Sequence, residues 1–309
     1  MRAVRTTTTM SLEKPELVLP VENRCGEGPV WDSNRQCLLW ADIEPGLLHE
    51  FQPATGQLNQ CAVGFPFSAI ALTEKTALIL GGPRGLDLWC GPGKAAIPLQ
   101  RDGAGEPLAI NDMVADARGC IYAGTIFWGA NGRERFGKLW LLSPNAPPQI
   151  VDDGIELANG LGFSPDQRTL YLTDSAARKI LAYDVEPQTG LLRNKRSFTQ
   201  VSRNEGLPDG LKVDSLGYVW SAQWYGAQIV RYDPDGKVER RIEMPVSQVA
   251  SLAFGGRDLM DLYVTTAGEL WRSDFAPPGF DFAAPNLGGP LFRIRVEVPG
   301  QSEHRAAFG

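Results

Sequence analysis

NGLGFSPDQRTLYLTDS, at residues 159–175, decides the fold, because its pattern recurs along the chain. Each copy places polar or small residues before a short apolar run, a turn and an alternating strand. The other clear copies are NDMVADARGCIYAGT at 111–125 and DGLKVDSLGYVWSAQW at 209–224. Fainter copies are EGPVWDSNRQCLLWADI at 27–43, SAIALTEKTALILGG at 68–82 and SLAFGGRDLMDLYVTTA at 251–267. Repeats of about 20 to 50 residues are typical of solenoids and propellers.

The spacing of the copies selects between those two architectures. Their first residues, at positions 27, 68, 111, 159, 209 and 251, are 41, 43, 48, 50 and 42 residues apart, which suits a four-stranded propeller blade. Several copies are followed by a further strand and a glycine-containing hairpin, as in LLHEFQPATGQL at 47–58 and QIVRYDPDGKVERR at 228–241. The sequence therefore predicts an all-β fold, a six-bladed β-propeller with four-stranded antiparallel blades.

The ends of the repeat region predict how the ring closes. An open ring would leave unpaired strand edges, and the segments ELVLP at 16–20 and LFRIRVEV at 291–298 are extra strands suited to sharing one blade. We expect a flexible lead-in over residues 1–15, a single propeller over 16–298 and a C-terminal tail over 299–309.

The composition of the chain argues against nucleic acid and membranes as binding partners. The 309 residues are 43% hydrophobic, and 30 basic against 36 acidic residues give a net charge of -6, so no basic face is expected for nucleic acid or anionic lipid. No stretch is long and apolar enough to span a membrane. Five cysteines without CxxC spacing favour a reducing, cytoplasmic location over a disulfide framework.

Four oxygen-bearing residues stand at equivalent positions of the repeat: Glu27, Asn111, Asn159 and Asp209. Taken singly, an Asn-Gly or Asp-Gly pair is most often a turn. In a propeller, however, the innermost strands start beside one central channel, so these side chains should converge. Two carboxylates there would repel unless a cation lies among them. Calcium, magnesium or manganese suits an all-oxygen set, with calcium favoured, and zinc or iron would also fit an open site.

The sequence lacks most of the residues and motifs that other catalytic arrangements need. His49 and His304 are the only histidines, and both are expected at the surface. No GxSxG elbow, P-loop or GxGxxG turn is present. Cys25 lies two residues before Glu27 and is interpreted as an ordinary buried thiol.

The chain resembles the senescence marker protein, gluconolactonase and luciferin-regenerating enzyme-like family, which includes regucalcin. The motifs that carry the resemblance are GEGPVWD at 26–32, INDMVAD at 110–116, ANGLGFSPD at 158–166 and LPDGLKVD at 207–214. The resemblance implies that Glu27, Asn159 and Asp209 bind a metal, that Asn111 contacts substrate, and that Asp209 also transfers protons.

The activity implied by the resemblance is metal-dependent hydrolysis of a lactone. The metal would polarise the carbonyl while water attacks, with Asp209 as general base. Because a metal-bound carboxylate is a weak base, a metal-bound hydroxide would serve equally well. A phosphotriesterase-like hydrolase and a non-catalytic calcium-binding regulatory protein are the alternatives. The expected partner is a small-molecule lactone or ester, and the chain is expected as a monomer or small homo-oligomer.

Two departures from the sugar-lactonase pattern predict a less polar substrate. Ala109 stands where those enzymes often carry an arginine, and Ile126, Phe127 and Trp128 stand where polar residues often follow AGT. Trp128 is expected at the channel mouth as a substrate-binding residue, with Trp224 on an opposite wall. The alternative is that these aromatic residues only pack between blades.

Overall fold

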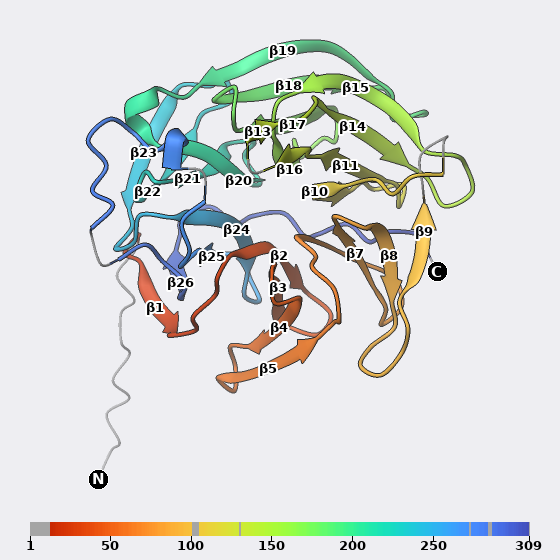
Figure 1. The fold of residues 1–309 in the computed structure, drawn as a ribbon, viewed down its shortest axis with the longest axis horizontal. Helices are drawn as coiled ribbons and strands as arrows, with labels where there is room; N and C mark the ends of the chain where they lie inside the picture. Colours follow the sequence, from red (N-terminus) through yellow and green to blue (C-terminus); the bar gives the residue numbers. More distant parts are fainter. Residues whose placement is uncertain (1–12, 101–104, 130, 272, 284–285, 309) are drawn as a thin grey trace.

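The computed structural model describes residues 13–100, 105–129, 131–271, 273–283 and 286–308. Residues 1–12, most of the expected lead-in, lie outside this range. The described chain forms six four-stranded antiparallel sheets around a common centre (Figure 1). This arrangement confirms the predicted six-bladed β-propeller.

The first three blades follow the chain in order. Blade one contains β2 (Gly26–Asp32), β3 (Cys37–Asp42), β4 (Leu47–Gln52) and β5 (Gln57–Ala62). Blade two contains β6 (Ala69–Leu72), β7 (Leu78–Gly82), β8 (Gly85–Trp89) and β9 (Ile97–Gln100). Blade three contains β10 (Ile110–Ala115), β11 (Ile121–Thr125), β14 (Gly137–Leu142) and β15 (Gln149–Ile155), and the small hairpin β12 (Trp128–Gly129) with β13 (Gly132–Arg133) extends from it.

The remaining blades complete the ring. Blade four contains β16 (Ala158–Phe163), β17 (Thr169–Asp174), β18 (Lys179–Val185) and β19 (Leu192–Gln200). Blade five contains β20 (Leu207–Val213), β21 (Val219–Trp224), β22 (Gln228–Tyr232) and β23 (Val238–Glu243). Blade six contains β24 (Val249–Gly255), β25 (Asp261–Thr266), β26 (Leu291–Arg295) and β1 (Glu16–Leu19). Two 3₁₀ turns, η1 (Arg203–Glu205) and η2 (Ser273–Phe275), lie in connections.

Two sets of contacts close the ring of blades, one at its centre and one at the outside of blade six. The innermost strands β2, β6, β10, β16, β20 and β24 each contact the next, and β24 contacts β2. At the outside of blade six, β1 pairs antiparallel with β26, with Leu17 opposite Phe292. The predicted sharing of one blade by the two end strands is therefore confirmed.

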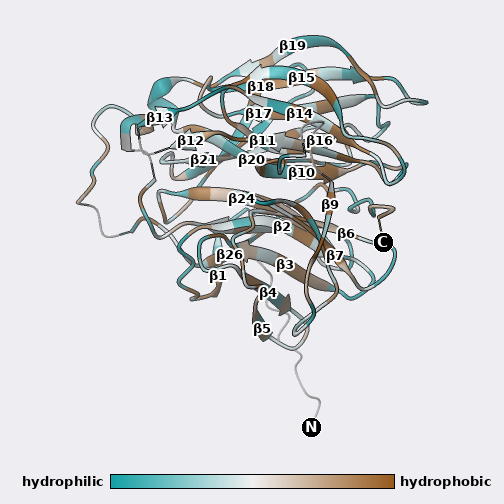
Figure 2. Cartoon of the chain, turned by 45° about the vertical axis from the view of Figure 1, so that its right-hand side comes forward, coloured by the Kyte–Doolittle hydropathy of each residue, from teal (hydrophilic) through white to brown (hydrophobic). Residues whose placement is uncertain are grey.

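The hydrophobic core lies between neighbouring blades. One cluster joins Leu39 of blade one to Leu80 of blade two, and others repeat this arrangement around the ring. Figure 2 shows hydrophobic residues in inner strands such as β10 and β24. The expectation that His49 lies at the surface is wrong. His49 is 2% exposed and stacks on Trp40 with ring centroids 4.6 Å apart, because the faces of a blade pack against neighbouring blades.

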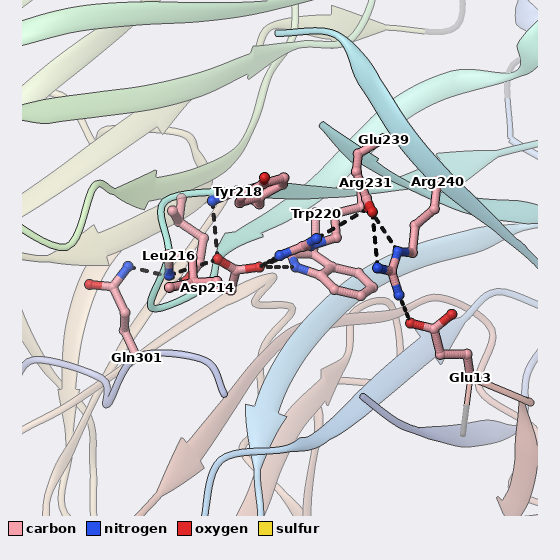
Figure 3. A network of polar contacts seen from close by, with 10 residues as sticks. Glu13, Asp214, Leu216, Tyr218, Trp220, Arg231, Glu239, Arg240 and Gln301 are labelled. Atoms are coloured by element: carbon pink, nitrogen blue, oxygen red, sulfur yellow. Dashed lines mark hydrogen bonds and ion pairs between the residues drawn. The ribbon is translucent and has the colours of Figure 1, made fainter. Parts of the chain in front are cut away.

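The C-terminal residues 299–308 pack across the ends of the innermost strands that are remote from Glu27 and Asp209. Ala306 pairs with Thr73 and Gly300 with Asp214. Asp214 is fully buried and accepts hydrogen bonds from the Trp220 indole at 2.9 Å and the Arg231 guanidinium at 2.6 Å (Figure 3). This end of the ring is held by buried polar contacts. In the part of the chain that the structure describes, no helix has the length and apolar character to cross a membrane.

Candidate active site

The three predicted metal-binding residues stand near the starts of three innermost strands. Glu27 in β2, Asn159 in β16 and Asp209 in β20 are 8%, 9% and 5% exposed. The pairing register of each strand with its neighbour shifts just after or around these residues. Such bulges re-aim side chains at strand ends, so all three are buried at the same end of the ring.

Glu27 and Asp209 are two buried carboxyl groups at this end of the ring. Burial raises the pKa of Asp209 well above its ordinary value, and Glu27 raises it further. Burial likewise raises the pKa of Glu27. The Glu27 carboxylate accepts a hydrogen bond from the Gly28 N–H at 3.1 Å. The buried Asp209 Oδ1, in contrast, has no hydrogen-bond partner among the residues that the structure describes. A buried carboxylate oxygen without a partner is costly unless a proton or cation reaches it.

Asp112, in β10, is a further carboxylate that acts electrostatically on both Glu27 and Asp209. It raises the pKa of both Glu27 and Asp209, and its own pKa is raised to about 6 by burial, against the lowering effect of Lys212. The register shift between Ile110 and Asp112 accounts for its position, because a regular strand would turn neighbouring residues to opposite faces. In the sequence, the Asn-Asp pair at 111–112 is the feature that could have indicated this carboxylate.

Two further aspartates fix the backbone segments that lead into β2 and β16. Asp42, at the end of β3, accepts hydrogen bonds from the backbone N–H groups of Arg24 and Cys25 at 3.2 and 2.9 Å. Asp174, at the end of β17, accepts those of Glu156 and Leu157 at 3.1 and 3.0 Å. Each aspartate thus fixes the backbone two or three residues before a site residue.

The amide side chains are tied to neighbouring groups. Asn159 donates from Nδ2 to Ser175 Oγ at 3.3 Å, and Asn111 donates from Nδ2 to the Ala158 carbonyl at 2.9 Å. These contacts orient both amides, since a bound NH₂ group fixes where the carbonyl oxygen of the same amide points. The Asn111 contact also joins blade three to blade four beside Asn159.

The glycines of the Asn-Gly and Asp-Gly pairs lie in strands, where they allow neighbouring blades to approach. A Cβ on Gly160 would lie 2.2 Å from Leu211 N, and one on Gly210 would lie 2.2 Å from Ser251 Oγ. The small residue is needed for close approach of two backbones rather than for a turn.

The residues present fit a hard divalent cation. No group of three or more His, Cys, Asp or Glu side chains in the described ranges is arranged to hold a metal, so a metal here would need the Asn159 amide beside the two carboxylates. Carboxylate and amide oxygens are the donors that calcium and similar ions prefer. The unpartnered Oδ1 of Asp209 supplies a buried acceptor for such an ion.

Residues 25–268 match the SMP-30/gluconolactonase/LRE-like region. This chain belongs to that family. Pentonolactonase XacC of Haloferax volcanii is 34% identical, covering 94% of this chain and 97% of the relative. The 6-deoxy-6-sulfogluconolactonase of Pseudomonas putida is 33% identical, covering 90% and 93%. The solved structure of the calcium-binding protein regucalcin from Agrobacterium tumefaciens has a TM-score of 0.82 at 26% identity, covering 95% of this chain and 97% of that one.

The two aromatic residues expected at the channel mouth lie in different surroundings in this family member. Trp128, in β12, is half-buried and donates from Nε1 to the Glu156 carbonyl at 2.9 Å. Trp224 is 5% exposed in a cluster with Leu207 and Tyr225. Trp128 therefore lies in the small hairpin that extends from blade three, and Trp224 lies in the apolar cluster beside the start of β20.

Proposed function

We propose that this chain hydrolyses lactones with one divalent metal ion held by Glu27, Asn159 and Asp209. The observation that carries the proposal is the buried, unpartnered Asp209 Oδ1 beside a second buried carboxylate. Similarity to two lactonases supports the reaction class. Similarity to a calcium-binding regucalcin supports calcium, and magnesium, manganese, zinc and iron are the other ions to test.

A divalent ion bound there supplies positive charge that polarises the lactone carbonyl. The chain's own residues perform the remaining work. Asp209 is the group proposed to take a proton from the attacking water and return it to the ring oxygen as the acyl C–O bond breaks, giving a hydroxy acid. Asn111 is proposed to bind substrate, since its amide is already oriented by Ala158.

The neighbouring thiol is not the nucleophile in this proposal. Burial raises the pKa of Cys25 well above its ordinary value, and Glu27 and Asp209 raise it further. The thiolate, which is the reactive form of cysteine, is therefore disfavoured at this position. Water remains the nucleophile.

The test is a pH-indicator assay of chelator-treated protein, reloaded with single cations, against sugar, aliphatic and aromatic lactones. Hydrolysis that requires a cation and is lost in Asp209→Asn supports the proposal. Cation binding, measured by calorimetry, without turnover of any lactone would favour a non-catalytic calcium-binding protein. Turnover of phosphotriesters instead of lactones would favour the second hydrolase class.

A further inference from the structure

The connection between β25 and β26 leaves blade six at the same end of the ring as Glu27 and Asp209, because β25 ends there beside the start of β24. Its described parts are residues 267–271, 273–283 and 286–290. This connection forms hydrogen bonds with residues of blades four and five. The Arg178 guanidinium of blade four donates to the Phe275 carbonyl at 2.7 Å. The Tyr225 hydroxyl of blade five donates to the Trp271 carbonyl at 2.5 Å.

Aromatic contacts carry the connection on to blade three. The Trp128 ring lies 5.3 Å from the Phe275 ring and 6.3 Å from the Trp271 ring, edge to face in both cases. Blades three and six are opposite in a six-membered ring. These contacts therefore span the end of the ring at which the carboxylates lie. We call Trp128, Trp271 and Phe275 the aromatic roof.

The inner side of the roof reaches the site through apolar residues. Phe275 and Cys25 pack against the cluster that contains Leu207 and Trp224. Leu207 lies two residues before Asp209, and Cys25 lies two residues before Glu27. Apolar side chains therefore connect the roof to the chain segments that carry the two carboxylates.

Three arginines near the roof form bonds to other groups of the protein. Arg24 forms a two-point ion pair with Glu269 at 2.5 and 2.8 Å, and Arg133 pairs with Glu156 at 2.7 Å. Arg178 donates to the backbone of the connection as described above. A polyhydroxylated substrate needs polar partners placed for its hydroxyls, whereas these guanidinium groups are committed to the protein.

We propose that the aromatic roof is a specificity-determining wall that binds the apolar part of a lactone, so that aromatic or alkyl-substituted lactones are the preferred substrate class. Arg178 is a positioning residue in this proposal, since it holds Phe275 through the backbone. The inference rests on the proposed lactonase function for the reaction and on the roof contacts for the preference.

The first test compares kcat/KM for dihydrocoumarin, an aromatic δ-lactone, with that for glucono-δ-lactone. We expect the wild type to prefer dihydrocoumarin. Phe275→Ala should lower kcat/KM for dihydrocoumarin about 10-fold and change that for the sugar lactone less than 3-fold, because a stacked aromatic contact is lost only by the aromatic substrate. Phe282→Ala is the matched control. Phe282 lies in the same connection, is 47% exposed and packs on Phe280 rather than on the roof.

The second test does not depend on turnover. Binding of 3,4-dihydro-2-quinolinone, the lactam analogue of dihydrocoumarin, is followed by tryptophan fluorescence in Asp209→Asn protein. Adding Phe275→Ala should raise the Kd about 10-fold, and adding Arg178→Gln should raise it by a smaller factor. In the active protein Arg178→Gln should raise KM for dihydrocoumarin more than it lowers kcat.

The outcomes separate the two proposals. A preference for the sugar lactone that Phe275→Ala leaves unchanged would overturn the roof proposal while the lactonase stands. If no lactone is hydrolysed, the lactonase proposal fails, and lactam binding decides the roof alone. Equal lactam affinity of the proteins with and without the Phe275→Ala substitution would refute the roof proposal.

Discussion

Replacing Asp209 with asparagine should stabilise the metal-free protein while it removes the proposed activity. Asp209 is buried, and its Oδ1 has no hydrogen-bond partner among the described residues. Burial and the nearby Glu27 raise its pKa well above the ordinary value of 3.8. Holding this carboxyl therefore costs free energy whether it is charged or protonated. Asparagine has nearly the same shape and carries no charge.

Two limits bound the expected gain in the free energy of unfolding. The lower limit is about 1 kcal/mol, the scale of one buried polar group left without a partner. The upper limit is the cost of protonating an ordinary carboxyl at pH 7, roughly 3 pH units or about 4 kcal/mol. Since 1 kcal/mol corresponds to about 2 °C in a domain of this size, we expect the Tm in chelator to rise by about 2 to 8 °C.

The assay is thermal unfolding in chelator and then in calcium. Asp174→Asn is the matched control, because Asp174 is equally buried but its two oxygens accept backbone hydrogen bonds. That variant should lose stability. Calcium should raise the Tm of the wild type and leave Asp209→Asn nearly unchanged, and lactone turnover should fall at least about 10²-fold in Asp209→Asn. A metal-free Asp209→Asn protein that melts at or below the wild-type Tm would refute the reasoning.

Three other outcomes are expected. Chelation should abolish lactone hydrolysis and one divalent cation should restore it; full turnover with metal absent by elemental analysis would contradict this. Burial lowers the pKa of His49 to about 4, so the unfolded chain takes up a proton near its ordinary value of 6.5 first, and stability is lost as pH falls through the window from 6.5 to 4. Urea unfolding at pH 8 and pH 5 should show the wild type losing about 2 kcal/mol more than His49→Gln, and equal losses would exclude the effect. Gly160→Ala should cost about 3 kcal/mol or more, because its Cβ would lie 2.2 Å from a backbone nitrogen. Gly162→Ala should cost less, because its Cβ would lie 3.1 Å from the Val213 side chain and no nearer than 3.7 Å to backbone; similar losses in urea unfolding would count against the close-approach argument.

The blades could be predicted because each is local in sequence. Strands that neighbour one another along the chain also pair, as β16 does with β17, so one repeat carries the information for one blade. The positions of Glu27, Asn159 and Asp209 at strand starts follow from the same repeat. That all three side chains are buried at one end follows from closure of the ring. It could be predicted only after the six copies of the repeat had been counted.

The parts that were not predicted depend on contacts between distant segments. Asp112 joins the site through a bulge that no periodicity reveals. Phe275 meets Trp128 across the ring although neither lies in a recognisable motif. His49 was placed wrongly because alternation in a single strand does not show that both faces of a blade are covered.

The pairing of β1 with β26 sets the order in which the ring can assemble. Arg293 and Glu16 are ion-paired at a sequence separation of 277 residues, whereas hairpins within a blade form between neighbours. Long-range contacts are reached late because loop closure costs entropy, so the blades can form before the ring is fastened. Until β1 docks, the outer edge of β26 is an exposed template for strands of other chains. The four residues of β1 thus cover a strand edge that would otherwise favour aggregation.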